Sequence, residues 1–189
     1  MTIFELSLLA SASFIAGIIN SIAGGGSFLT FPALVFTGVP TIAANATSAV
    51  AVFPGYLSGA LGFAKELKEY PKSKFLLLII LSVLGGIGGS LLLLITPANV
   101  FSYIIPWLLG FATLLFASGD FVGKWAEKNS NSNGITGNLA TLIVCIYGGY
   151  FNGGLGIVLL ALFSTLGLRD IHLMNGLKNI MSFALSAAS

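Results

Sequence analysis

The stretch Ser21-Ile22-Ala23-Gly24-Gly25-Gly26-Ser27 places three consecutive glycines in the middle of a long apolar run. A second run is interrupted in the same way at Tyr150-Phe151-Asn152-Gly153-Gly154-Leu155-Gly156. The runs cover residues 4–36 and 135–168, and a straight helix of that length would be about 50 Å long, well beyond a hydrocarbon core of about 30 Å. Glycine admits non-helical dihedrals without steric cost. We therefore expect each run to be either a discontinuous helix or a span followed by a short re-entrant arm.

The composition indicates that most of the chain is surrounded by lipid. Hydrophobic residues make up 56% of the 189 positions and charged residues only 7%, which is too little polar surface for a soluble domain of this size. Apolar stretches of spanning length cover residues 4–36, 41–64, 75–95, 101–119, 135–168 and 171–189. The expected fold is an all-α, polytopic transmembrane helical bundle in the bilayer of the plasma or inner membrane.

The order of elements around the two breaks predicts two related repeats. Each break is followed by a short apolar segment, a turn, and a helix with polar residues at intervals of three and four, which is typical of a face turned to the bundle interior. The stripes are Thr41, Asn45 and Ser48 in the first helix, and His172, Asn175, Lys178, Asn179 and Ser182 in the second. Residues 1–119 form the first repeat, 120–134 a cytoplasmic loop, and 135–189 a second repeat that is expected to be truncated at its C-terminus. Whether the repeats are parallel or inverted is left open.

The positions of the lysines predict which loops face the cytoplasm. One short loop contains Lys65, Lys68, Lys72 and Lys74, and another contains Lys124 and Lys128. Short lysine-rich loops stay in the cytoplasm, and the two spans between them return the chain to the same side. Counting each broken run as one crossing puts residues 38–40, 96–100 and 169–170 on the other side, and the N-terminus in the cytoplasm.

The two breaks are the candidate substrate site. In hydrocarbon, broken helices must face protein or a watery cavity, and the start of a half-helix offers N–H groups and a partial positive charge to an anion. The candidate binding residues are Asn20, Gly24, Gly25, Gly26, Ser27, Asn45, Thr47, Ser48, Asn152, Gly153, Gly154, Gly156, Asn175, Lys178 and Asn179.

Several of these residues have a second interpretation. Lys178 is a lone charge inside an apolar helix, which is costly unless the charge is used. It is either the counter-charge for an anionic substrate, the partner of an acid in the C-terminal part that is expected to be missing, or a side chain that extends to the membrane interface. Asn20 and Asn152 either bind substrate or satisfy backbone groups opened by the glycines. The glycine pairs 55/59, 85/89 and 149/153 are interpreted as close helix packing.

Other functional classes find little support. The glycine clusters lack the Lys-Ser/Thr pair of a phosphate-binding loop and the preceding strand of a dinucleotide fold. A net charge of +2 does not favour nucleic acid, and Cys145 alone provides neither a disulfide nor a metal site. We see no catalytic constellation and expect a protein that is not an enzyme, without metal or cofactor. Coupling to protons and assembly into a homo-oligomer are left open.

One family shares these motifs. The stretch 16–27, with Pro32, Gly38, Pro40 and Ala44-Asn45-Ala46-Thr47-Ser48, resembles the opening signature of the sulfite exporter TauE/SafE family, and 148–156 with Asn175-Gly176-Leu177-Lys178-Asn179 resembles its second-half motif. The resemblance implies a membrane permease with two related halves that moves sulfite, sulfoacetate or related organosulfur anions. The alternatives are an anion or small-solute channel, which would not show saturable and competed uptake, and a non-transporting scaffold, in which Lys178→Ala would change no solute phenotype.

Overall fold

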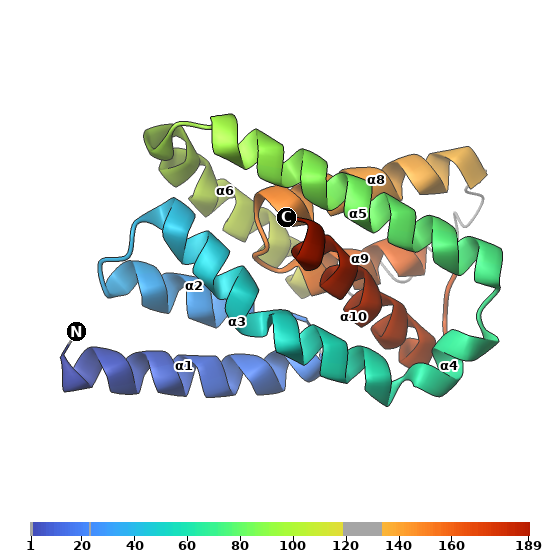
Figure 1. Ribbon diagram of the computed structural model, residues 1–189, viewed down its shortest axis with the longest axis horizontal. Coiled ribbons are helices and arrows are strands. Elements are labelled where there is room, and N and C mark those ends of the chain that lie inside the picture. Colours follow the sequence, from blue (N-terminus) through green and yellow to red (C-terminus); the bar gives the residue numbers. More distant parts are fainter. Residues whose placement is uncertain (1, 23, 119–133) are drawn as a thin grey trace.

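The computed structural model describes residues 2–22, 24–118 and 134–189. All regular structure in these residues is helical, which confirms the predicted all-α class (Figure 1). In chain order the helices are α1 (Ile3–Ile22), α2 (Ser27–Phe36), α3 (Thr41–Gly62), α4 (Ala64–Glu69), α5 (Lys72–Ile95), α6 (Ala98–Ala117), α8 (Gly134–Tyr150), α9 (Leu155–Thr165) and α10 (Ile171–Ala188).

Both glycine clusters interrupt helical structure, as predicted. Gly24 and Gly154 adopt φ values of +79° and +71°, in the left-handed region that favours glycine. A Cβ atom built on Gly26 would lie 2.5 Å from the carbonyl oxygen of Ala16, so α2 starts against the side of α1. The chain therefore turns back at the break, and α8 and α9 form a second hairpin of the same kind (Figure 1). Of the two alternatives left open by the sequence, the structure adopts the re-entrant arm.

The helices that follow the two hairpins run antiparallel to each other. Phe63 at the end of α3 lies 6.0 Å from the His172 ring at the start of α10, whereas Phe53 lies 4.5 Å from Phe183 further along α10, measured between ring centroids. Figure 1 shows that α1 and α8 also enter the molecule from opposite ends. The tips of the two hairpins consequently meet near the middle of the bundle.

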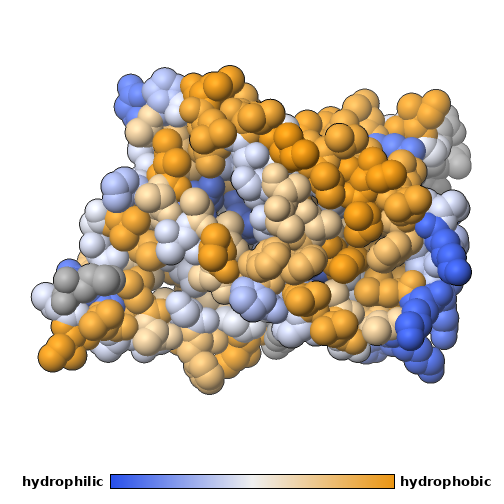
Figure 2. Space-filling model, viewed as in Figure 1, coloured by the Kyte–Doolittle hydropathy of each residue, from blue (hydrophilic) through white to orange (hydrophobic). Residues whose placement is uncertain are grey.

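Three helices in the described ranges are long and apolar enough to cross a membrane, namely Ile3–Asn20, Lys72–Ile95 and Ala98–Leu115. The segments Ser27–Phe36, Gly134–Tyr150 and Leu155–Thr165 are apolar but shorter. The stretches that form α3 and α10 were also expected to be spans, but they fall outside this group because their polar stripes lower the hydropathy. Figure 2 shows apolar side chains over most of one face, with hydrophilic residues gathered toward its ends.

The structure places one loop at a different end of the molecule from the end expected by counting membrane crossings along the sequence. Figure 1 places the start of α1 and the lysine-bearing helix α4 at opposite ends of the molecule. The turn at residues 169–170 lies at the lysine end, since Gly176 in the first turns of α10 packs against Leu67 of α4. Counting crossings placed this turn on the side opposite the lysines. That prediction was wrong because each glycine-broken run turns back toward the end of the molecule where it began, instead of crossing once.

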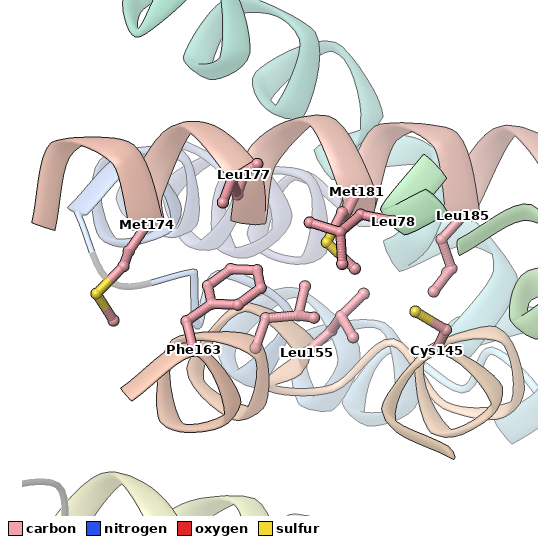
Figure 3. Packing of buried hydrophobic residues seen from close by; sticks show 9 residues of the cluster. Leu78, Cys145, Leu155, Phe163, Met174, Leu177, Met181 and Leu185 are labelled. Carbon is pink, nitrogen blue, oxygen red and sulfur yellow. The ribbon is translucent and has the colours of Figure 1, made fainter. Parts of the chain in front are cut away.

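The largest apolar core lies between α10 and the second hairpin (Figure 3). Met174, Leu177, Met181 and Leu185 follow one face of α10 and point toward Leu155 and Phe163 of α9 and Cys145 of α8. The polar stripe of α10 occupies the adjacent face of the same helix. Packing of the apolar face thus orients Lys178 and its neighbours toward the first hairpin.

Candidate functional site

The tips of the two hairpins touch through their backbones. A Cβ atom on Gly156 would lie 2.5 Å from Cα and 2.8 Å from the carbonyl oxygen of Gly24, and a Cβ atom on Gly24 would lie 2.6 Å from Cα of Gly156. Both predicted site glycines therefore serve the close approach of two segments that are far apart in the sequence.

Two predicted site residues, Ser27 and Asn45, fasten the second hairpin to the first half of the chain. The Ser27 hydroxyl donates to the carbonyl oxygen of Asn152 at 3.0 Å and accepts from the Gly154 N–H at 3.2 Å. The Asn45 amide donates to the carbonyl oxygen of Tyr150 at 3.2 Å and accepts from the Asn152 N–H at 3.4 Å. Backbone groups released by the second break are thus satisfied by side chains.

The side chain of Asn152 is held from two sides. Its Oδ1 accepts from the Tyr56 hydroxyl at 3.1 Å, and its Nδ2 donates to the Ser186 hydroxyl at 3.2 Å. Sequence reasoning missed both partners. Tyr56 was detectable, because it continues the spacing of Asn45 and Ser48 along the buried face of α3. Ser186 lacked an equally clear signal.

The starts of the two half-helices are less open than expected. The Phe28 N–H donates to the carbonyl oxygen of Gly25 at 3.1 Å, and the Leu155 N–H donates to that of Asn152 at 3.3 Å. The N–H of Gly154 is bound to Ser27. These amides are satisfied by the tight turns that begin each half-helix, so the expectation of unpaired N–H groups does not hold for them.

Lys178 lies beside the contact between the two hairpin tips, and none of its surface is exposed. Its Nζ donates to Oδ1 of Asn175 at 2.8 Å and to the carbonyl oxygen of Asn20, in the last turn of α1, at 3.4 Å. A Cβ atom on Gly24 would lie 3.1 Å from Cδ of this lysine. Within the described part of the chain no carboxylate pairs with it, and its burial rules out extension to the membrane interface.

Three buried polar atoms on these helices lack a hydrogen-bond partner among the described residues: Oδ1 of Asn20, Nδ2 of Asn179 and Oγ of Ser182. A buried polar group without a partner costs about 1–3 kcal/mol. A bound solute with oxygen atoms would satisfy the donors and the charge of Lys178 together. The donors that face such a solute are Lys178, Asn179 and Ser182. The free Oδ1 of Asn20 is itself an acceptor. Both ends of the Asn175 side chain are already bound, to Lys178 and to the carbonyl oxygen of Ile171.

The remaining candidates lie elsewhere. Thr47 is exposed on the outer side of α3 and is not brought to the site. Ser48 is buried and exchanges a hydrogen bond of 2.5 Å with Thr30 of α2. Gly25 lies against the Ile157 side chain, and the Gly153 carbonyl oxygen accepts from the Tyr147 hydroxyl. In the described ranges, no group of three His, Cys, Asp or Glu side chains is placed to hold a metal ion.

Comparison with known proteins places this chain in a family. The model of the family described as "Sulfite exporter TauE/SafE" matches residues 9–189. A "Probable membrane transporter protein" of Haemophilus influenzae is 30% identical over 95% of this chain and 73% of its own length. The "Probable membrane transporter protein ORF9" of a Sinorhizobium species is 32% identical over 85% of this chain and 61% of its own length. The "Probable membrane transporter protein YfcA" of Escherichia coli is 35% identical over 55% of this chain and 38% of its own length.

The chain therefore spans about three quarters of the first of these relatives and less than two thirds of the other two. No solved structure matches it. The family match covers nearly all of the chain, including both glycine breaks and Lys178. The chain belongs to the sulfite exporter TauE/SafE family, whose members are multi-pass membrane transporters and not enzymes.

Proposed function

We propose that this protein carries a small anion, sulfite or an organosulfonate, across the membrane, and that the anion binds beside Lys178. One observation carries the proposal: a fully buried lysine without a carboxylate partner among the described residues lies where two broken helices meet. A buried charge is expensive unless it is paired. An anionic substrate would supply the missing pair, and the family description supports sulfur oxyanions as the class.

Carrier activity is favoured over an open channel by the contact between the hairpin tips. Gly24 and Gly156 leave no space between their backbones, so passage at this point requires the hairpins to move. Rocking or gating of one repeat against the other around a central site is the usual mechanism of transporters built from broken helices.

An inverted repeat is part of the same proposal. The sequence of elements α1, α2 and α3 is repeated by α8, α9 and α10, and positive-φ glycines occur at Gly24 and Gly38 in one copy and at Gly154 and Gly167 in the other. The antiparallel course of α3 and α10 supports the inverted relation over the parallel one. Such symmetry would let the same two packings alternate between the two sides of the membrane.

The first test measures binding of anions to the purified protein. We expect sulfite or sulfoacetate to raise the melting temperature, while chloride at the same ionic strength does not, because a ligand that binds only the folded state stabilises it by about 2.7 kcal/mol at 100 times its Kd. Taurine and sulfate extend the series to a zwitterion and a fully oxidised anion. The absence of a shift with every anion would contradict the anion proposal without affecting the family membership.

Within the same proposal, the lysines indicate which end of the folded molecule faces the cytoplasm. The segment 65–74 carries four lysines, and we propose that it faces the cytoplasm. Because Figure 1 places the start of α1 at the other end, the N-terminus then faces the outside, in contrast to the count from sequence alone. In intact cells, we expect an impermeant thiol reagent to label Thr2→Cys and to leave Ser73→Cys unlabelled until the membrane is opened. The reverse pattern would contradict this orientation.

A further inference from the structure

Three neighbouring polar side chains of α10 are buried and incompletely paired. Lys178 and Ser182 have no exposed surface, and only 1% of Asn179 is exposed. Nδ2 of Asn179 and Oγ of Ser182 have no hydrogen-bond partner among the described residues. The ammonium of Lys178 has three N–H groups, for which the described residues provide two acceptors. Because these positions lie within one turn of the helix, one side of α10 carries three donors with unused capacity.

The fold itself does not require these donors. In the proposed inverted repeat, α3 is the counterpart of α10. The positive-φ glycines of the two breaks are separated by the same interval as the starts of these two helices. By this interval, the positions in α3 that correspond to the three donors are Ser48, Ala49 and Val52. Ala49 and Val52 have no side-chain donor, and the Ser48 hydroxyl is hydrogen-bonded to Thr30. The same hairpin and helix are thus built in the first half without an unpartnered donor at these positions, so the architecture does not explain the donors of α10.

Gly59 of α3 leaves room for the Asn179 amide. A Cβ atom built on Gly59 would lie 2.5 Å from Nδ2 and 2.8 Å from Cγ of Asn179, so a larger residue would displace this side chain. The amide therefore lies against the backbone of α3, although its Nδ2 finds no partner among the described residues.

A sulfite or sulfonate group offers one acceptor oxygen to each of the three donors. It has three oxygen atoms that share the negative charge, whereas a carboxylate has two and a halide has no separate acceptor atoms. A site with buried donors rejects a ligand that leaves one of them unpaired, because that donor has given up water without a replacement. Three buried donors, one of them charged, therefore fit an anion with three oxygens best.

We infer that Asn179 and Ser182 are specificity-determining residues, which select an anion with three oxygens while Lys178 supplies the charge. Each donates a hydrogen bond to one oxygen of the anion, and Gly59 positions the Asn179 amide. The anion reaches these buried donors when the hairpin tips separate, as the carrier proposal requires. This inference rests on the proposed anion carrier.

The test compares methanesulfonate with acetate, which have the same methyl group and the same charge but three and two oxygens. Thermal-shift titrations of the purified protein give the affinity for each anion. We expect the wild type to prefer methanesulfonate. The preference should fall about tenfold in Ser182→Ala and in Asn179→Leu, because methanesulfonate loses one hydrogen bond to a charged group, whereas acetate still finds two donors. The melting temperature of Ser182→Ala without anion should not fall, because the hydroxyl that it removes has no partner.

Ser82→Ala is the matched control. Ser82 also has no exposed surface, but its hydroxyl donates to the carbonyl oxygen of Leu78 within α5 at 2.8 Å. The same substitution there removes a hydroxyl that is already paired, so we expect this variant to keep the wild-type preference for methanesulfonate.

Gly59→Ala tests the position of the Asn179 amide. We expect this variant to lower the preference for methanesulfonate about as much as Asn179→Ala does, because its Cβ atom displaces the amide. Combined with Asn179→Ala, it should have no further effect, since no amide remains to be displaced. Additive effects of the two substitutions would contradict the positioning role of Gly59.

Two results would overturn the inference and leave the carrier standing. One is a wild type that binds both anions equally well. The other is an unchanged preference in Ser182→Ala and Asn179→Leu, which, together with a lower melting temperature, would assign these side chains a structural role only. A wild type that binds neither these anions nor sulfite would contradict the carrier and the inference together.

Discussion

Lys178→Met is expected to weaken anion binding about 100-fold in a protein that still folds. Methionine keeps an unbranched side chain of similar length in a site with no exposed surface, and it removes a charge that no carboxylate among the described residues compensates. Loss of the uncompensated charge is favourable, but Oδ1 of Asn175 and the carbonyl oxygen of Asn20 lose their donor, which costs about 1–3 kcal/mol for a buried acceptor. We therefore expect a modest loss of stability in a protein that still folds. The anion, in contrast, loses its only cationic partner among the described residues at this site, so we expect affinity to fall about 100-fold, or roughly 3 kcal/mol.

Thermal-shift titration with the anion that stabilises the wild type measures both effects. Lys74→Met is the control, because Lys74 is exposed near the start of α5 and its loss removes the same charge far from the site. We expect the control to titrate like the wild type. A Lys178→Met protein that binds the anion with unchanged affinity would show that the lysine has a structural role only, as the scaffold hypothesis requires.

Gly24→Ala is expected to destabilise the protein severely by separating the two hairpin tips. The substitution has two costs. An alanine at φ +79° is strained by about 1–2 kcal/mol, and its Cβ atom would lie 2.6 Å from Cα of Gly156. Because the second contact is with backbone, relief requires a whole segment to move, which adds about 1–3 kcal/mol.

Gly38→Ala separates the two costs. Gly38 has nearly the same dihedral, φ +84°, but no atom lies within 4 Å of its Cβ position. We expect this control to lose only the conformational part, about 1–2 kcal/mol, and to keep anion binding. The melting temperatures of the two variants and the wild type in the same detergent measure the difference. Equal losses for Gly24→Ala and Gly38→Ala would mean that the contact between the tips contributes nothing.

The sequence predicted much of the local structure correctly. Both glycine clusters interrupt helices, α2 and α9 are short, and α3 and α10 carry the polar stripes. These features depend on hydropathy, on periodicity and on the dihedral freedom of glycine, all of which are properties of a few neighbouring residues. The sequence placed Lys178 on a polar stripe but left open whether its side chain extends to the membrane interface, and the structure buries it completely.

The roles within the site were harder to predict. Ser27 and Asn45 were proposed to contact substrate, but in the structure they bind backbone groups of the second hairpin. Thr47, in the same motif, points outward. Hydrogen-bonding side chains are suited to a solute and to an opened backbone alike, so their residue type does not distinguish the two uses.

The sequence by itself therefore determined that this is an all-helical membrane protein with two broken helices and one lysine within an apolar helix. Only the tertiary structure decided that the hairpins meet tip to tip, that α3 and α10 run antiparallel, and that Lys178 is completely buried. The physical reason is the range of the interactions. Helix formation and breakage depend on residues a turn apart, whereas the contact of Gly24 with Gly156 depends on how every helix between them packs.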